Sequence, residues 1–138
     1  MKKIFADTGY WIALLNPNDD LHEKARTIRQ SLISNEIIVT SEMVFVELLN
    51  AFSGMGEHNR KKAVKLVQYA TQNTKIEVIP QTTALFEFAL QQYKRRPDKN
   101  WSLTDCSSFQ IMTQQNITEA LAHDKHFEQA GFIALLRK

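Results

Sequence analysis

Ile4-Phe5-Ala6-Asp7-Thr8-Gly9 is the stretch that decides the fold, and Tyr10-Trp11-Ile12-Ala13-Leu14-Leu15 follows it directly. Residues 4–6 form a short apolar run that ends at an acid, and residues 8–15 have the composition of an apolar helix. A strand this apolar is typical of the centre of a parallel sheet, which is covered on both faces. Open α/β sheets bind ligands outside the carboxyl ends of their strands. Asp7 is therefore expected where such folds keep their chemistry.

The composition is that of an ordinary globular chain of 138 residues, with 43% hydrophobic and 23% charged residues. We expect a single domain over residues 1–138, long enough to bury a sizeable core. The formal net charge of +2 is compatible with a nucleic-acid partner but does not by itself indicate one.

Several features favour a cytoplasmic protein. The single cysteine, Cys106, cannot form an internal disulfide, which suits a reducing compartment. Lys2-Lys3 precedes an apolar run, but Asp7 interrupts it and no small-residue cleavage site follows, so we expect no signal peptide. No apolar stretch approaches the roughly 20 residues that span a membrane.

Strands and helices alternate along the chain. Apolar and β-branched runs predict strands at residues 4–6, 37–39, 75–79, 119–122 and 133–135. Apolar periodicity and capping signals predict helices at residues 8–15, 21–33, from Thr40 or Ser41 to 52, 57–71, 82–95 and 103–115. This alternation is typical of an α/β fold, a three-layer α/β/α sandwich around a mostly parallel sheet of about five strands.

Glu47 interrupts the run Met43-Val44-Phe45-Val46-Glu47-Leu48-Leu49, which is apolar nearly all round a helix and is therefore expected to be buried. An isolated buried carboxylate is costly and needs a partner or a proton. A partly exposed glutamate on the helix flank, or one paired with a lysine, is an equally good interpretation of the run alone.

Asp105 and Asp124 each have a structural interpretation as well. Ser102-Leu103-Thr104-Asp105 fits a capping box, in which the acid accepts a hydrogen bond from the backbone of the cap residue. Asp124 follows Ala120-Leu121-Ala122 as Asp7 follows its own apolar run, and on its own it is a loop aspartate that caps the next turn. Two strand ends that each carry an aspartate favour a shared site.

A parallel sheet brings Asp7 and Asp124 to one edge. Asp105 begins a helix that leads into the strand before Asp124, and Glu47 lies in the first turns of the helix after residues 37–39. Carboxylates that converge in this way repel one another unless a cation neutralises them, and oxygen ligands favour Mg²⁺ or Mn²⁺. Such a site can bind a phosphate oxygen and lower the pKa of a water, as phosphodiester hydrolysis requires.

Four motifs in this order resemble those of the PIN-domain ribonucleases, in particular the VapC-type toxins of toxin–antitoxin pairs. They are Phe5-Ala6-Asp7-Thr8, Val46-Glu47-Leu48, Ser102-Leu103-Thr104-Asp105 and His123-Asp124-Lys125-His126-Phe127. The resemblance covers the whole chain. It implies a five-stranded parallel sheet between helices, a homodimer, and an antitoxin that inserts a side chain or helix at the active-site groove.

The resemblance also implies a Mg²⁺-dependent (or Mn²⁺-dependent) endoribonuclease whose catalytic acids are Asp7, Glu47, Asp105 and Asp124. Asp7 and Asp105 are the surest metal ligands on that analogy, and Asp124 helps to hold the same ion or a second one. Glu47 orients or deprotonates the attacking water.

Further residues are candidates for binding RNA. Thr8 and Thr104 each stand beside an acid and can hydrogen-bond a carboxylate or a substrate phosphate. Basic runs are usually solvated faces, but we hypothesise that Arg95 and Arg96 flank the groove and bind RNA phosphates. Trp101 could stack on a base, although an aromatic so close to apolar segments is more often part of a core.

Two other functional classes remain open. A phospho-accepting receiver domain also gathers acids at strand ends, but it needs adjacent acids after the first strand, and here Thr8 follows Asp7. A non-catalytic RNA-binding or antitoxin-binding PIN-like scaffold would keep the fold without the chemistry. A zinc site at His123, Asp124 and His126 matches no familiar ligand spacing.

Overall fold

The computed structural model describes residues 1–32 and 35–138 and contains one parallel sheet with the strand order β3-β2-β1-β4-β5. Every neighbouring pair of strands is parallel, as an α/β sandwich requires. The apolar strand at the start of the chain lies at the centre of the sheet. The strands are β1 (Lys2–Ala6), β2 (Glu36–Ser41), β3 (Ile76–Ile79), β4 (Glu119–Leu121) and β5 (Ile133–Ala134).

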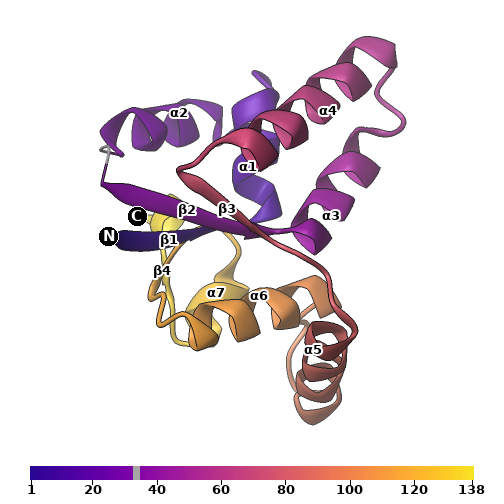
Figure 1. Cartoon of the computed structure of the whole chain (residues 1–138), viewed down its shortest axis with the longest axis vertical. Coiled ribbons are helices and arrows are strands. Elements are labelled where there is room, and N and C mark those ends of the chain that lie inside the picture. The colour runs from indigo at the N-terminus through magenta and orange to yellow at the C-terminus, as the bar shows by residue number, and fades with distance from the viewer. Residues whose placement is uncertain (33–34) are drawn as a thin grey trace.

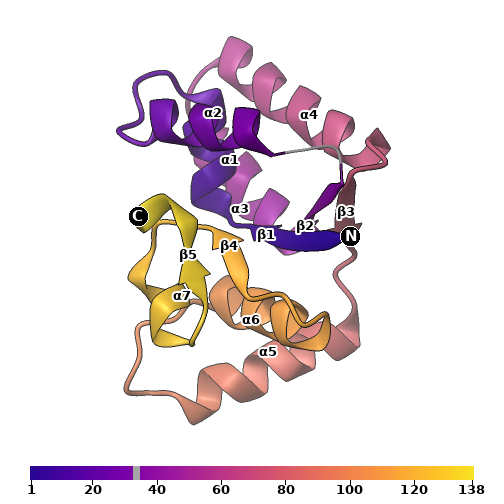
Figure 2. The ribbon, with the colours of Figure 1, turned by 90° about the vertical axis from the view of Figure 1, so that its left-hand side faces the viewer.

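Helices cover both faces of the sheet (Figures 1 and 2). One layer holds α1 (Thr8–Leu15), α2 (His22–Ser31), α3 (Glu42–Phe52) and α4 (Glu57–Gln72). The other holds α5 (Thr83–Arg95), α6 (Leu103–Gln114) and α7 (Lys125–Gln129), and a 3₁₀ turn, Leu135–Arg137, comes last. In the part of the chain that the structure describes, no helix has the length and apolar character to cross a membrane.

The three-layer architecture predicted from the sequence is confirmed, and most element boundaries differ by one or two residues. Ile33, the expected end of the second helix, lies outside the described residues. Two short elements were not expected: α7 and the final 3₁₀ turn. Both are too short to show the apolar periodicity from which helices are predicted.

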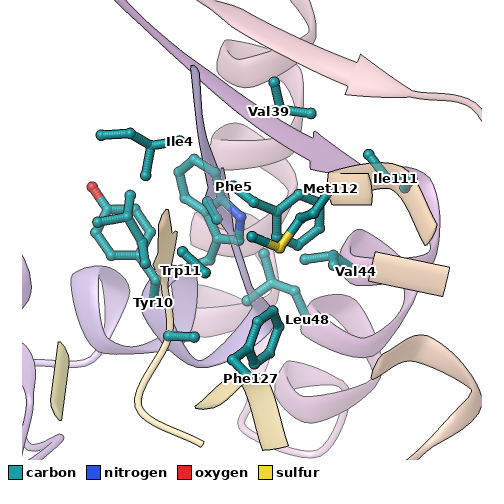
Figure 3. Packing of buried hydrophobic residues seen from close by; sticks show 14 of the residues in the cluster. Ile4, Phe5, Tyr10, Trp11, Val39, Val44, Leu48, Ile111, Met112 and Phe127 are labelled. Atoms are coloured by element: carbon teal, nitrogen blue, oxygen red, sulfur yellow. The ribbon is translucent and has the colours of Figure 1, made fainter. Parts of the chain in front are cut away.

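The core lies against both faces of β1 (Figure 3). Phe5 is fully buried, and its ring centroid is 6.5 Å from that of Phe127 on α7. On the other side of the sheet, Trp11 of α1 packs against Phe45 of α3, and their ring centroids are 5.9 Å apart. Burying a large apolar side chain contributes about 1.5–3 kcal/mol. The same contacts fix three helices that position acids discussed below: α1 begins directly after Asp7, α7 begins directly after Asp124, and α3 carries Glu47.

The sequence predicted that helix α3 is buried on all sides, and this expectation was wrong. Val44 and Leu48 are fully buried, whereas Val46 is 55% exposed and Glu47 is half-buried. The helix packs against α1 and α4 on one side and approaches α6, which leaves the Val46 side open to solvent. Apolar composition alone did not reveal which face lacks a neighbour.

Candidate active site

The carboxyl ends of β1, β2 and β4 meet at one edge of the sheet. The backbone N–H of Asp7 donates to the Leu121 carbonyl over 3.1 Å, which ties the end of β1 to the end of β4. On the other side, the Thr40 hydroxyl at the end of β2 donates to the Ala6 carbonyl over 2.9 Å. These bonds hold Asp7 at the centre of this edge.

The side chain of Asp7 is buried, at 9% exposure. Burial raises its pKa from an ordinary 3.8 to about 7, although a hydrogen bond from the Thr8 backbone favours the charged form. The negative charges of Asp105, Glu47 and Asp124 make smaller contributions to the same rise in pKa. The four acids therefore share one electrostatic neighbourhood, although their elements are far apart in sequence.

Asp105 forms the capping box that its sequence indicates. Its backbone N–H donates to the Ser102 hydroxyl over 2.9 Å, and its Oδ2 accepts from the Ser102 N–H over 3.0 Å. The same Oδ2 lies 2.9 Å from Nδ1 of His126. The structural interpretation of Asp105 is thus correct, and it leaves the carboxylate at the same edge of the sheet as Asp7.

Asp124 likewise caps a helix. Its Oδ1 accepts from the His126 N–H over 3.0 Å at the start of α7, and it lies 3.2 Å from Nδ1 of the same histidine. One ligand atom each from Asp105, Asp124 and His126 lies within 4.8 Å of the other two. His126 was not among the site residues proposed from the sequence, although it stands in the motif that contains Asp124.

Glu47 has a hydroxyl partner rather than a lysine. The Thr8 hydroxyl donates to its Oε1 over 2.6 Å and so connects the start of α1 to α3. Thr8 was expected to hydrogen-bond either a carboxylate or a substrate phosphate, and this contact is a hydrogen bond of the first kind. Thr104 is buried directly before Asp105 at the N-terminus of α6.

Within residues 1–32 and 35–138 the two candidate arginines form no ion pair with the four acids. Arg95 is exposed at the end of α5. Arg96 forms two hydrogen bonds with Asp98, at 3.0 and 3.1 Å, and its guanidinium carbon lies 5.0 Å from the ring centroid of Trp101. Pairing with Arg96 lowers the pKa of Asp98. Trp101 is buried, as the core interpretation expected.

The donor set fits a hard divalent cation. The close cluster of possible ligand atoms holds Asp105, Asp124 and His126, and Asp7 and Glu47 stand outside it. Within the described residues no lysine or arginine pairs with any of the four acids. Burial and like charge raise the pKa of Asp7, and a nearby cation would reverse that effect. Carboxylate oxygens are typical ligands of Mg²⁺ and Mn²⁺.

Comparisons with known proteins identify relatives of this chain. The family model for the PIN domain matches residues 4–133. The chain is 29% identical over 130 residues to the 23S rRNA-specific endonuclease VapC20 of Mycobacterium tuberculosis, covering 94% of this chain and 95% of that protein. The crystal structure of VapC20, described as a sarcin-ricin loop cleaving toxin, matches with a TM-score of 0.83 at 28% identity, covering 94% of this chain and 96% of that one.

Two more distant crystal structures share the fold. FitAcB from Neisseria gonorrhoeae matches with a TM-score of 0.65 at 20% identity, covering 95% of this chain and 94% of that one. VapBC2 from Rickettsia felis, bound to a DNA fragment from its promoter, matches with a TM-score of 0.68 at 15% identity, covering 96% of both chains. At these identities the likeness extends to the fold alone.

Proposed function

The chain belongs to the PIN-domain family, and from that premise we propose that it is a Mg²⁺-dependent or Mn²⁺-dependent endoribonuclease and the toxin of a type II toxin–antitoxin pair. The observation that carries the proposal is the cluster of ligand atoms from Asp105, Asp124 and His126, all within 4.8 Å of one another, at the edge of the sheet where Asp7 is hydrogen-bonded to the end of β4. The raised pKa of Asp7, to which Asp105, Glu47 and Asp124 contribute, is consistent with it. Across the described ranges no lysine or arginine neutralises these acids, and buried carboxylates without such a partner favour a divalent cation.

Asp7, Asp105 and Asp124 are the proposed ligands. When bound, the ion neutralises charge on a phosphate oxygen and lowers the pKa of a water. Glu47 is the proposed base: the Thr8 hydroxyl holds its Oε1, and its carboxylate takes a proton from the attacking water. The water oxygen forms a bond to phosphorus as the bond to the 3′ oxygen breaks, and the leaving 3′ oxygen takes a proton from solvent, which gives a 3′-hydroxyl and a 5′-phosphate.

RNA is the proposed substrate, and the similarity to a 23S rRNA-specific endonuclease makes ribosomal RNA the first substrate to test. Arg95 and Arg96 remain proposed phosphate-binding residues at the end of α5. Because Arg96 is already paired with Asp98, a phosphate would have to replace that carboxylate, whereas Arg95 is exposed. We therefore expect Arg95 to contribute more to RNA binding.

The proposed protein partner is an antitoxin, which the family resemblance places at the active-site groove. A second candidate surface for it is a groove of about 850 Å³ between α1, α2 and α4, whose described lining includes none of the four acids. Apolar side chains such as Trp11, Leu14 and Leu66 line the groove, and basic groups such as Arg26 and Lys65 stand beside them. This lining fits an apolar segment with acidic flanks.

A homodimer is also proposed. Phe86, Leu90 and Tyr93 lie at helical spacing on α5 and are 42%, 48% and 54% exposed. An exposed apolar stripe of this kind is characteristic of a protein–protein interface. A second copy of α5, packed against the first, would cover the stripe.

The decisive cell experiment is induction of the wild type and of Asp7→Asn, followed by sequencing of RNA ends. Growth arrest and mapped cuts with the wild type alone support the proposal and identify the target. Equal toxicity from both proteins favours the non-catalytic scaffold. Labelling by acetyl phosphate would instead indicate a receiver domain.

A further inference from the structure

We propose that His126 is a positioning residue that holds Asp105 and Asp124 together in the proposed active site. This inference rests on the proposed function, because it assigns these two acids to the site. Asp105 comes from the first turn of α6, and Asp124 follows β4. Within residues 1–32 and 35–138, His126 is the one residue whose side chain contacts both carboxylates.

A single ring nitrogen makes both contacts. Nδ1 of His126 lies 2.9 Å from Oδ2 of Asp105 and 3.2 Å from Oδ1 of Asp124. Ionised carboxylates only accept hydrogen bonds, so these contacts favour the form of the ring that carries its proton on Nδ1. The side chain of His126 is 15% exposed, and that of Asp105 is 11% exposed. The hydrogen bond to Asp105 is therefore strong, because little water competes for it, whereas the side chain of Asp124 is 45% exposed and its contact with the ring is the weaker one.

Each acid uses one oxygen for its hydrogen bonds. The Ser102 N–H and the His126 ring both donate to Oδ2 of Asp105, and the His126 backbone and ring both reach Oδ1 of Asp124. In the described part of the chain no hydrogen bond reaches the second oxygen of either acid. His126 thus orients both carboxylates and leaves one oxygen of each for a cation.

The core determines where the histidine stands. The next residue, Phe127, is fully buried, with ring centroids 5.0 Å from Phe109 and 6.5 Å from Phe5. Because that ring anchors α7, the ring of His126 is held towards α6. Outer partners that orient metal ligands typically change metal affinity by about 10- to 100-fold when they are removed.

The test compares His126→Leu, which removes the donor, with His126→Asn, whose side-chain amide can donate from nearly the same place as Nδ1. Mn²⁺ affinity is measured by calorimetry, and the Mn²⁺ dependence of RNA cleavage is measured beside it. We expect His126→Leu to weaken Mn²⁺ binding by about 10- to 100-fold and His126→Asn to stay within about threefold of the wild type. The cleavage defect of His126→Leu should shrink at saturating Mn²⁺.

His123→Leu is the matched control, because His123 is exposed on the same loop and should leave Mn²⁺ affinity unchanged. Unchanged affinity in His126→Leu, with only a lower melting temperature, would make the histidine purely structural and overturn the proposal. Equal losses in His126→Asn and His126→Leu would point to the imidazole as a direct ligand and also overturn it. If His126→Leu does not fold, His126→Ala removes the same donor.

Calorimetry needs no RNA, so the two proposals can fail separately. A wild type that cleaves no RNA but binds Mn²⁺ through a His126-dependent site would contradict the nuclease function alone. A wild type that cleaves RNA, with affinity unaffected by His126→Leu, would contradict the positioning role alone.

Discussion

The hydroxyl of Thr8 donates a 2.6 Å hydrogen bond to Oε1 of Glu47 and joins the first residue of α1 to the middle of α3. The two helices follow the two neighbouring strands β1 and β2, so the bond spans the edge of the sheet at which Asp7 stands. The hydrogen bond gives Oε1 of the half-buried Glu47 a partner, and it thereby fixes the direction in which Oε2 points.

Replacing Thr8 with valine should therefore impair Glu47 without disturbing the fold. Thr8→Val keeps the side-chain shape and removes the donor, so we expect kcat to fall about tenfold with little change in KM. The free energy of unfolding should fall by about 1 kcal/mol. Thr8→Ser keeps the hydroxyl and should retain most of the activity. Steady-state cleavage and urea unfolding measure both effects, and wild-type kcat in Thr8→Val would exclude this role.

The raised pKa of Asp7 predicts a pH-dependent cost to stability in the absence of metal. Below about pH 4 the carboxyl is protonated in both states and costs nothing. Between pH 4 and 7 the unfolded chain ionises first, because the folded pKa is about 7 rather than 3.8, so stability falls as pH rises. At about 1.4 kcal/mol per pKa unit, the loss reaches a few kcal/mol.

Asp7→Asn removes that titration and should be more stable than the wild type above pH 7, with the difference vanishing towards pH 4. Urea unfolding of both proteins in EDTA across this range measures it. A difference in stability that is independent of pH would show that Asp7 titrates normally.

A bound divalent cation should offset the loss of stability that the ionised carboxylate of Asp7 causes. Because Asp7 must lose its proton to ligate a cation, Mg²⁺ or Mn²⁺ should raise the melting temperature more at pH 8 than at pH 6. Asp7→Asn should show a smaller rise with less dependence on pH. Thermal unfolding with and without Mg²⁺ tests this, and equal stabilisation of both proteins at both pH values would place the binding elsewhere.

Neutralising the arginines at the end of α5 should reduce the salt dependence of RNA binding. Removing one cation that binds a phosphate lowers the slope of log affinity against log salt by about 0.7 for a single strand. We expect Arg95→Gln to show most of this effect and Arg96→Gln less, because Arg96 is paired with Asp98. Lys61→Gln, on α4 in the opposite helix layer, is the control. An unchanged slope in the Arg95→Gln/Arg96→Gln double variant would refute the hypothesis.

The placement of Asp7 and Asp124 at one edge could be predicted because the signal is local. Each follows an apolar run, and parallel strands bring their carboxyl ends together whatever the details of packing. The Asp105 capping box was predictable for the same reason, since its partners lie within one helical turn.

The contacts that join the acids depend on tertiary packing and could not be predicted. The residues around Glu47 were compatible with an exposed, a lysine-paired or a buried side chain. The packing of α1 against α3 decides that its partner is the hydroxyl of Thr8. His126 reaches Asp105 because Phe127 anchors α7, a helix of five residues that shows no periodicity of its own.

The central claim is that Asp7, Asp105 and Asp124 ligate one divalent ion. A crystal of the wild type grown with Mn²⁺ and measured at the manganese absorption edge tests it most directly. We predict an anomalous peak at coordination distance, close to 2.1 Å, from carboxylate oxygens of Asp7 and Asp105, with Asp124 bound directly or through water. Ordered carboxylates without a peak at saturating Mn²⁺, or a peak away from Asp7, would contradict it.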